Sequence, residues 1–330
     1  MLTYDELMER EDAPAGSAWG LFGPDDQAGT LNHLTPERVA AAAGLVKRGA
    51  TFNLDYPLNV FNPYPSGTRE PTVHRIFAHH SNHRDDYLDS FYLQSTTQLD
   101  GFRHIRHPVH GFYNWTSDDD IVESNPALGI QHWAERGITG RGVLLDVERF
   151  LADAGEPIDQ DSNHPIGLDV LTATAESHGV TVEPGDILLI RTGWTQYFLE
   201  HVRGDARARF PQNIRCPGLA QTRELVAWLW DSRIALVAMD NFAVEALPPI
   251  PDSPFTYLDP KTGALLSPEL EGKIHPQLIS LLGMPIGEMW FLDDLAADCA
   301  HDGVYEFFVT AKPLNVIGGV GSTSNALALK

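Results

Sequence analysis

Short apolar runs alternate with amphipathic stretches over the second half of the chain. Residues 142–147, 186–192 and 234–239 are largely apolar, which is typical of strands buried on both faces of a sheet. Helices are predicted between them, over 167–178 and 217–232. This alternation predicts an α/β core, a mixed sheet layered with helices.

The remaining pattern is weaker but still divides the chain. Residues 1–33 are expected to form an irregular lead-in, and Thr35-Pro36 supplies an N-cap and a first-turn proline for a helix over 40–46. Further predicted strands cover 51–58, 72–78, 91–99, 286–291 and 305–311, and further predicted helices cover 128–136, 276–282 and 293–299.

Two polar or proline-rich segments are expected to lie outside the core. Residues 79–90, which contain His79, His80 and His83, are interpreted as a solvated loop, because the histidine spacing fits no recognised ligand set. Residues 248–268 hold six prolines and are predicted to form a long loop, serving as a lid or an oligomer arm. We expect one compact domain over residues 1–330.

Composition narrows the possible partners. The formal charge of -22 argues against nucleic acid or an anionic membrane, because phosphate binding needs clustered Lys and Arg, so a small-molecule substrate is expected. The two cysteines lack metal-site spacing, and neither a signal peptide nor a membrane-spanning run is recognisable. A cytoplasmic location is the expectation.

Side chains that can bind a cation or transfer a proton are concentrated in residues 94–104. Side chains two apart on an extended chain point the same way, so Gln98 and Asp100 can face one ion, with Gln94 beside them. His104 follows Gly101, where the chain can turn back towards that ion. The alternative is that Gln98 and Asp100 bond the local backbone in a turn. His107 and His110 are interpreted as surface or supporting histidines.

A second group of candidates lies far downstream. Glu288 stands among Ile286, Met289, Trp290 and Phe291, and a carboxylate in such apolar surroundings must pair, bind a metal or take up a proton. His275 precedes a predicted helix. The terminal Gly318-Gly-Val-Gly-Ser lacks the lysine of a phosphate-binding loop and predicts a close backbone approach near the site.

Together these segments resemble the cyclase family that includes bacterial kynurenine formamidase and isatin hydrolase. The family motif is His-x-Gly-Thr-His-x-Asp-x-x-x-His, and the corresponding stretch here is Gln94-Ser-Thr-Thr-Gln98-Leu-Asp100-Gly-Phe-Arg-His104. The resemblance also covers 140–146, 185–193, 275–288 and the glycine-rich end. It implies a swivelling β/β/α fold, a homo-oligomer (dimer or tetramer), and divalent ions that activate water to hydrolyse an amide or cyclic amide.

Carried over by position, the resemblance makes Asp100, His275 and Glu288 metal ligands and His104 the proton-transfer histidine. Glutamines replace the first two motif histidines, which favours one ion, Mn²⁺ or Zn²⁺, with the Gln98 oxygen assisting. Residues expected to contact substrate, chosen by proximity in sequence, are Gln94, Phe102, Arg103, Tyr113, Trp115 and Trp19.

Three functions are compatible with this pattern. The first is a metal-dependent hydrolase of a C–N bond in a small amide. The second is a lyase, cyclase or isomerase in which Asp100, His104 and Glu288 act as acid and base without a catalytic metal. The third is a non-catalytic binder of small molecules.

Overall fold

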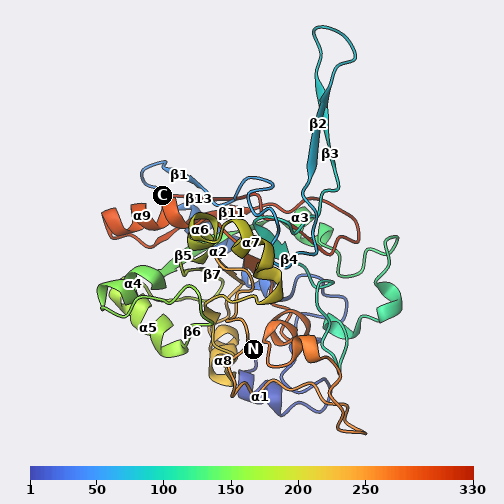
Figure 1. Cartoon of the computed structure of the whole chain (residues 1–330). Helices are drawn as coiled ribbons and strands as arrows, with labels where there is room; N and C mark the ends of the chain where they lie inside the picture. The colour runs from blue at the N-terminus through green and yellow to red at the C-terminus, as the bar shows by residue number, and fades with distance from the viewer.

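A curled nine-stranded sheet forms the centre of the molecule in the computed structural model, which describes residues 1–330 (Figure 1). The strand order is β1-β13-β11-β5-β7-β9-β10-β4-β12. Strands β5, β7, β9 and β10 run parallel, and the other pairings are antiparallel. The strands of this sheet are β1 (Thr51–Asn53), β4 (Gln98–Asp100), β5 (Ile138–Asp146), β7 (Ile187–Arg191), β9 (Leu236–Met239), β10 (Ile286–Glu288), β11 (Glu306–Ala311), β12 (Gly321–Thr323) and β13 (Ala326–Leu329).

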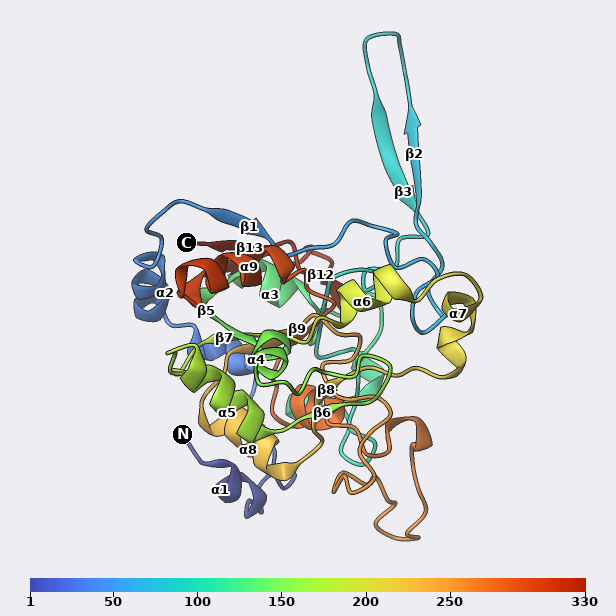
Figure 2. The ribbon, with the colours of Figure 1, turned by 60° about the vertical axis from the view of Figure 1, so that its left-hand side comes forward.

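Helices pack around the sheet, and two small strand pairs lie outside it (Figure 2). The α-helices are α1 (Tyr4–Met8), α2 (Pro36–Ala43), α3 (Gln131–Arg136), α4 (Val147–Asp153), α5 (Leu168–Ser177), α6 (Trp194–His201), α7 (Gly204–Arg209), α8 (Arg223–Asp231) and α9 (Asp293–Asp302). Short 3₁₀ turns are η1 (Gly29–His33), η2 (Tyr113–Trp115), η3 (Asp118–Asp120), η4 (Phe210–Gln212) and η5 (Pro268–Leu270), and η6 (Pro276–Leu281) is π-helical. The small pairs are β2 (Val73–Phe77) with β3 (Asp85–Asp89), and β6 (Pro165–Ile166) with β8 (Gly218–Leu219).

The apolar runs become the buried middle of the sheet. Every residue of β7 and β9 is buried, and most of β5 is as well. Parallel strands covered on both faces need such continuous apolar sequences. The amphipathic helices between them bury only one side, as the intermediate and exposed positions of α5 and α8 show. The predicted α/β core is therefore confirmed.

Local signals place most helix ends correctly. Thr35 caps α2 through its side chain, with Pro36 in the first turn, and Gly137 ends α3 with a φ of 74°. The helix predicted over 217–232 begins only at Arg223, because Thr222 is the cap and residues 218–219 form β8 instead. The predicted irregular lead-in contains α1, whose capping box joins Thr3 and Glu6.

The predicted strands of the first third are shorter than expected. Of residues 51–58 only 51–53 pair, and of residues 91–99 only 98–99 pair, as the start of β4. A strand needs a neighbour to pair with, and only these residues lie beside one. Residues 79–90 lie outside the core as predicted, and all of them except the half-buried His83 are exposed, yet they include strand β3, which pairs with β2.

The hairpin of β2 and β3 projects away from the body in both views (Figures 1 and 2). All ten residues of its two strands are exposed. Residues 248–268 form the predicted long loop, with one bridge between Leu258 and Leu265. No helix is both long enough and apolar enough to cross a membrane. The single domain and the homo-oligomer stay predictions.

Candidate metal centre and active site

Sheet register brings together the two halves of the predicted site. Strand β10 lies between β9 and β4, and Glu288 stands opposite Gln98 while Ile286 stands opposite Asp100. Directly paired residues share a face, and so do residues two apart, so Gln98, Asp100 and Glu288 point to the same side. His275 is the residue that precedes η6, and its side chain lies near Asp100 and Glu288.

Three of the predicted ligands form one compact cluster. Asp100, His275 and Glu288 are buried, and each offers one ligand atom within 4.8 Å of the other two. The Nε2 atom of His275 lies 3.2 Å from Oε1 of Glu288. Oδ2 of Asp100 is buried and has no hydrogen-bond partner. Such an atom costs free energy unless a proton or a cation satisfies it.

A further buried carboxylate holds His275 in place. Oε1 of Glu245 contacts Nδ1 of the His275 ring, and the same carboxylate accepts hydrogen bonds from the backbone N–H groups of Ile274 and His275. Burial alone would lower the pKa of His275, but hydrogen bonds to Glu245 and Glu288 outweigh it and raise the pKa. A carboxylate behind a ligating histidine is a common support in metal sites, because it fixes the ring orientation.

The Gln98 amide faces the cluster with its nitrogen. Its Oε1 accepts hydrogen bonds from Arg69 at 3.0 Å and from the Tyr64 hydroxyl at 3.3 Å. Its Nε2 donates to Oε2 of Glu288 at 2.6 Å and lies 3.4 Å from Oδ1 of Asp100. Turning the amide round would set its N–H groups against the guanidinium, so Arg69 selects this orientation. The glutamine predicted to lend an oxygen to a cation thus presents N–H groups to two carboxylates.

Gln94 links Asp100 to His104. Its Nε2 lies 2.5 Å from Oδ1 of Asp100 and 3.2 Å from Nδ1 of His104. Nε2 of His104 lies 3.7 Å from Oδ2 of Asp100. Burial lowers the pKa of His104, although the charge of Asp100 raises it. The imidazole is therefore expected to be neutral at pH 7 and able to accept a proton.

A cavity of about 140 Å³ opens beside this cluster. It is lined by Gln98, His104, His275 and Glu288, and by residues that the sequence did not single out: Tyr64, Arg69, Ile105, Phe242, Ala243, Leu247, Leu270 and Lys273. His104, Ile105 and Leu270 also line a more open groove of about 530 Å³. The cavity combines apolar walls with two cationic side chains, Arg69 and Lys273, which suits a small molecule that carries a negative or strongly polar group.

The predicted aromatic wall does not line this cavity. Trp19, Phe102 and Tyr113 are buried in the core, where Trp19 donates to the Ser280 carbonyl and Phe102 packs on Tyr113. Trp115 is half exposed, with its ring edge against Trp19. Proximity in sequence was the only reason for choosing these residues, and in space their side chains point elsewhere.

Arg103 and two other candidates also have structural partners. The Arg103 guanidinium donates to backbone carbonyls of Asp120, Val122, Asn125, Ala127 and Gly318, so it ties loops together. His107 is buried and stacks on His110 with ring centroids 4.7 Å apart, and neither lines the cavity beside the cluster. The interpretation of both as surface or supporting histidines stays a prediction.

Gly321 confirms the close approach predicted for the glycine-rich end. It pairs with Asp100 across β12 and β4, and a Cβ there would lie 2.6 Å from the side-chain amide carbon of Gln94. Any larger residue would push Gln94 off Asp100. Of the residues missed in the sequence, Glu245 had a usable signal, because it lies in an apolar run as Glu288 does.

Comparisons with known proteins agree with the fold. The family profile described as "Putative cyclase" matches residues 52–246. A crystal structure described as a novel cyclase shares 32% sequence identity and a TM-score of 0.77, covering 95% of this chain and 99% of its own. The chain therefore belongs to the cyclase family, and its fold is the swivelling β/β/α type expected from the resemblance.

More distant structures share the fold alone. Isatin hydrolase A from Ralstonia solanacearum is 17% identical with a TM-score of 0.56, covering 90% of this chain and 98% of its own. An isatin hydrolase bound to the product analogue thioisatinate is 15% identical with a TM-score of 0.55, covering 91% and 98%. Comparison with curated proteins finds no match.

The residues present fit a divalent cation. Two carboxylate oxygens and one imidazole nitrogen form a mixed oxygen and nitrogen donor set, which suits Zn²⁺ or Mn²⁺. The unpartnered Oδ2 of Asp100 and the support of His275 by Glu245 are both expected of such a site. Three protein ligands also leave coordination positions open.

Proposed function

We propose that the protein is a metal-dependent hydrolase of a C–N bond in a small amide or cyclic amide. The observation that carries this proposal is the convergence of one ligand atom each from Asp100, His275 and Glu288 beside a cavity. The cation, Mn²⁺ or Zn²⁺, would be held by these three residues, and when bound it would supply Lewis acidity towards water and carbonyl oxygen.

The residues of the chain supply the proton transfers. Hydrolysis adds water across the C–N bond, so one proton must leave the water and one must reach the departing nitrogen. His104 lines the cavity and is the group assigned to both transfers. Because the Gln94 amide lies at Nδ1 in the resting structure, His104 takes up a proton there only when that contact opens.

The cavity walls provide selection of the substrate. Ile105, Phe242, Leu247 and Leu270 offer apolar contact for an aromatic or cyclic body. Lys273 has no ion-pair partner among the salt bridges of the structure and lines the same cavity as Arg69. We therefore assign to Lys273 the binding of a negative or carbonyl group of the substrate.

The test is removal of the metal. Protein dialysed against a chelator should lose turnover of cyclic and N-formyl amide probes, isatin among them, and regain it with Mn²⁺ or Zn²⁺. Folded variants of Tyr64 and Lys273, two residues that line the cavity, test separately whether the substrate binds in the cavity. Undiminished turnover after verified metal removal would contradict the proposal.

One observation favours a second candidate, acid–base chemistry without a metal. The Gln98 N–H groups already donate to the carboxylates that a cation would bind, and Arg69, which donates to the Gln98 oxygen, adds positive charge nearby. Asp100, His104 and Glu288 would then act as acid and base in a lyase, cyclase or isomerase. This candidate predicts turnover that resists chelation and is lost in Asp100→Asn.

A further inference from the structure

The tip of the projecting hairpin carries a second group of ligand-type side chains. The ladder of β2 and β3 ends where Phe77 pairs with Asp85, so residues 78–84 form the tip loop. His79 and His83 lie in this loop and Asp85 begins β3. These three residues each offer one ligand atom within 4.8 Å of the other two.

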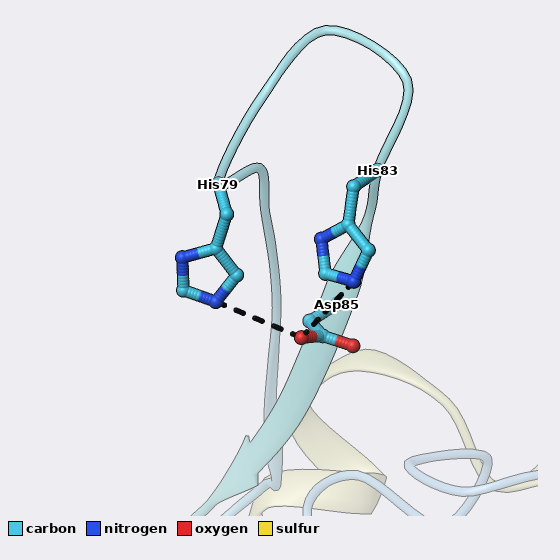
Figure 3. Close-up of side chains that lie close together, drawn as sticks. All are labelled: His79, His83 and Asp85. Atoms are coloured by element: carbon cyan, nitrogen blue, oxygen red, sulfur yellow. Dashed lines mark ion pairs between the residues drawn. The ribbon is translucent and has the colours of Figure 1, made fainter.

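Both imidazoles are directed at one carboxylate oxygen (Figure 3). Nε2 of His79 lies 3.7 Å and Nε2 of His83 lies 3.6 Å from Oδ2 of Asp85. Both separations exceed the 2.7–3.2 Å range of an N–H···O hydrogen bond. They are close to about 3.4 Å, the ligand-to-ligand edge of a tetrahedral zinc site with bonds of about 2.0–2.1 Å.

A simple ion pair on the same hairpin has a different geometry. His74 on β2 and Asp86 on β3 approach to 2.7 Å, which is an ordinary hydrogen-bonded pair. At the tip, both histidines lie beside the same carboxylate oxygen, and neither is within hydrogen-bonding distance of it. The spacing is therefore that of three ligands around a common centre, while His74 and Asp86 show what a direct contact looks like there.

The hairpin orders these ligands through local contacts. The Phe77 ring meets His79 edge-on with ring centroids 5.1 Å apart, and Phe77 also packs near Tyr87 at 6.1 Å. The rings of His79 and His83 lie 5.4 Å apart. Packing against Phe77 thus holds His79 near strand β3, which carries Asp85.

We propose that the hairpin tip binds one divalent transition-metal ion of the Zn²⁺ class through His79, His83 and Asp85. Two imidazole nitrogens and one carboxylate oxygen are typical zinc ligands. Since the three side chains are partly exposed, water or a further ligand completes the coordination. The bound ion closes the tip loop and stabilises a hairpin of only two strands, which has little stability alone.

The test is a calorimetric titration of the metal-free full chain with Zn²⁺ alone. Wild-type protein is compared with His79→Ala/His83→Ala, and His74→Ala serves as the matched control because it removes a hairpin histidine outside the site. The double variant should bind one equivalent fewer than the wild type, and the control should match the wild type.

This difference does not depend on what the buried cluster binds. If the buried cluster binds Zn²⁺, the double variant falls from two equivalents to one, and if it does not, from one to none. Equal stoichiometry and affinity in the wild type and the double variant would overturn the proposal. A Co²⁺ titration gives a second readout, since four-coordinate Co²⁺ absorption should appear in the wild type and be reduced in the double variant.

Discussion

The buried cluster of Asp100, His275 and Glu288 and the exposed hairpin-tip cluster of His79, His83 and Asp85 use similar side chains in opposite settings. The buried ligands come from segments almost 190 residues apart and are held by Glu245 and Gln98. The tip ligands lie within seven residues and have few supports. The spacing of potential ligands along the sequence therefore does not indicate how firmly the fold holds them in place, or whether they lie beside a cavity.

The largest effect on metal affinity is expected from removing the support of the buried histidine. Glu245→Gln keeps the size of the side chain but removes the charge behind His275, so metal affinity at the buried cluster should fall by about 10- to 100-fold. The measurement is a metal titration of the folded variant together with its turnover. His79→Ala/His83→Ala is the control, and it should leave turnover unchanged.

A smaller effect is expected from restoring the motif histidines. Gln94→His/Gln98→His replaces amide groups by imidazoles, which are better zinc ligands, so Zn²⁺ should bind more tightly, by about tenfold or more, relative to Mn²⁺. Competition between the two ions in wild type and variant measures this ratio. An unchanged ratio would show that neither position faces the cation.

A third effect concerns the pH dependence of stability and comes from a buried histidine outside both clusters. Burial first, and then the charges of Arg38 and Arg233, lower the pKa of His33 to about 4. Below its unfolded-state pKa of about 6.5, the unfolded chain binds a proton that folded His33 refuses, so the free energy of unfolding decreases as the pH falls from about 6.5 to about 4. For this one group the slope is at most about 1.4 kcal/mol per pH unit.

Denaturant unfolding at several pH values measures that slope. His33→Gln should be less stable at neutral pH but should flatten the slope between pH 6.5 and 4. A variant with the wild-type slope would assign the acid sensitivity to other groups.

Much of the fold follows from the sequence because the buried strands are apolar throughout and the helix ends carry caps. Of the strand predicted over 91–99, only the last two residues pair with a neighbour, because alternation does not reveal whether a neighbouring strand is present. Local chemistry singled out Gln98 with Asp100, and Glu288 among apolar residues, whereas the resemblance to the cyclase family joined them with His275 in one site.

Long-range geometry explains what the sequence did not indicate. Arg69 lies in a proline-rich loop, and nothing in its neighbours shows that it contacts Gln98. Likewise His79 and His83 converge on Asp85 only because β2 and β3 pair in one register. The aromatic residues near Asp100 were placed at the cavity by sequence proximity, but Phe102 and Tyr113 pack in the core and Trp115 is half exposed.

The most direct test of a catalytic site at the buried cluster is to compare the turnover of Asp100→Asn with that of His79→Ala/His83→Ala. Both are measured with the same amide probes after loading with Mn²⁺ or Zn²⁺. We predict a loss of about 10³-fold in the Asp100 variant, the scale at which removal of a key electrostatic group affects catalysis, and wild-type turnover in the hairpin variant. Wild-type turnover in a folded Asp100→Asn protein would contradict this prediction.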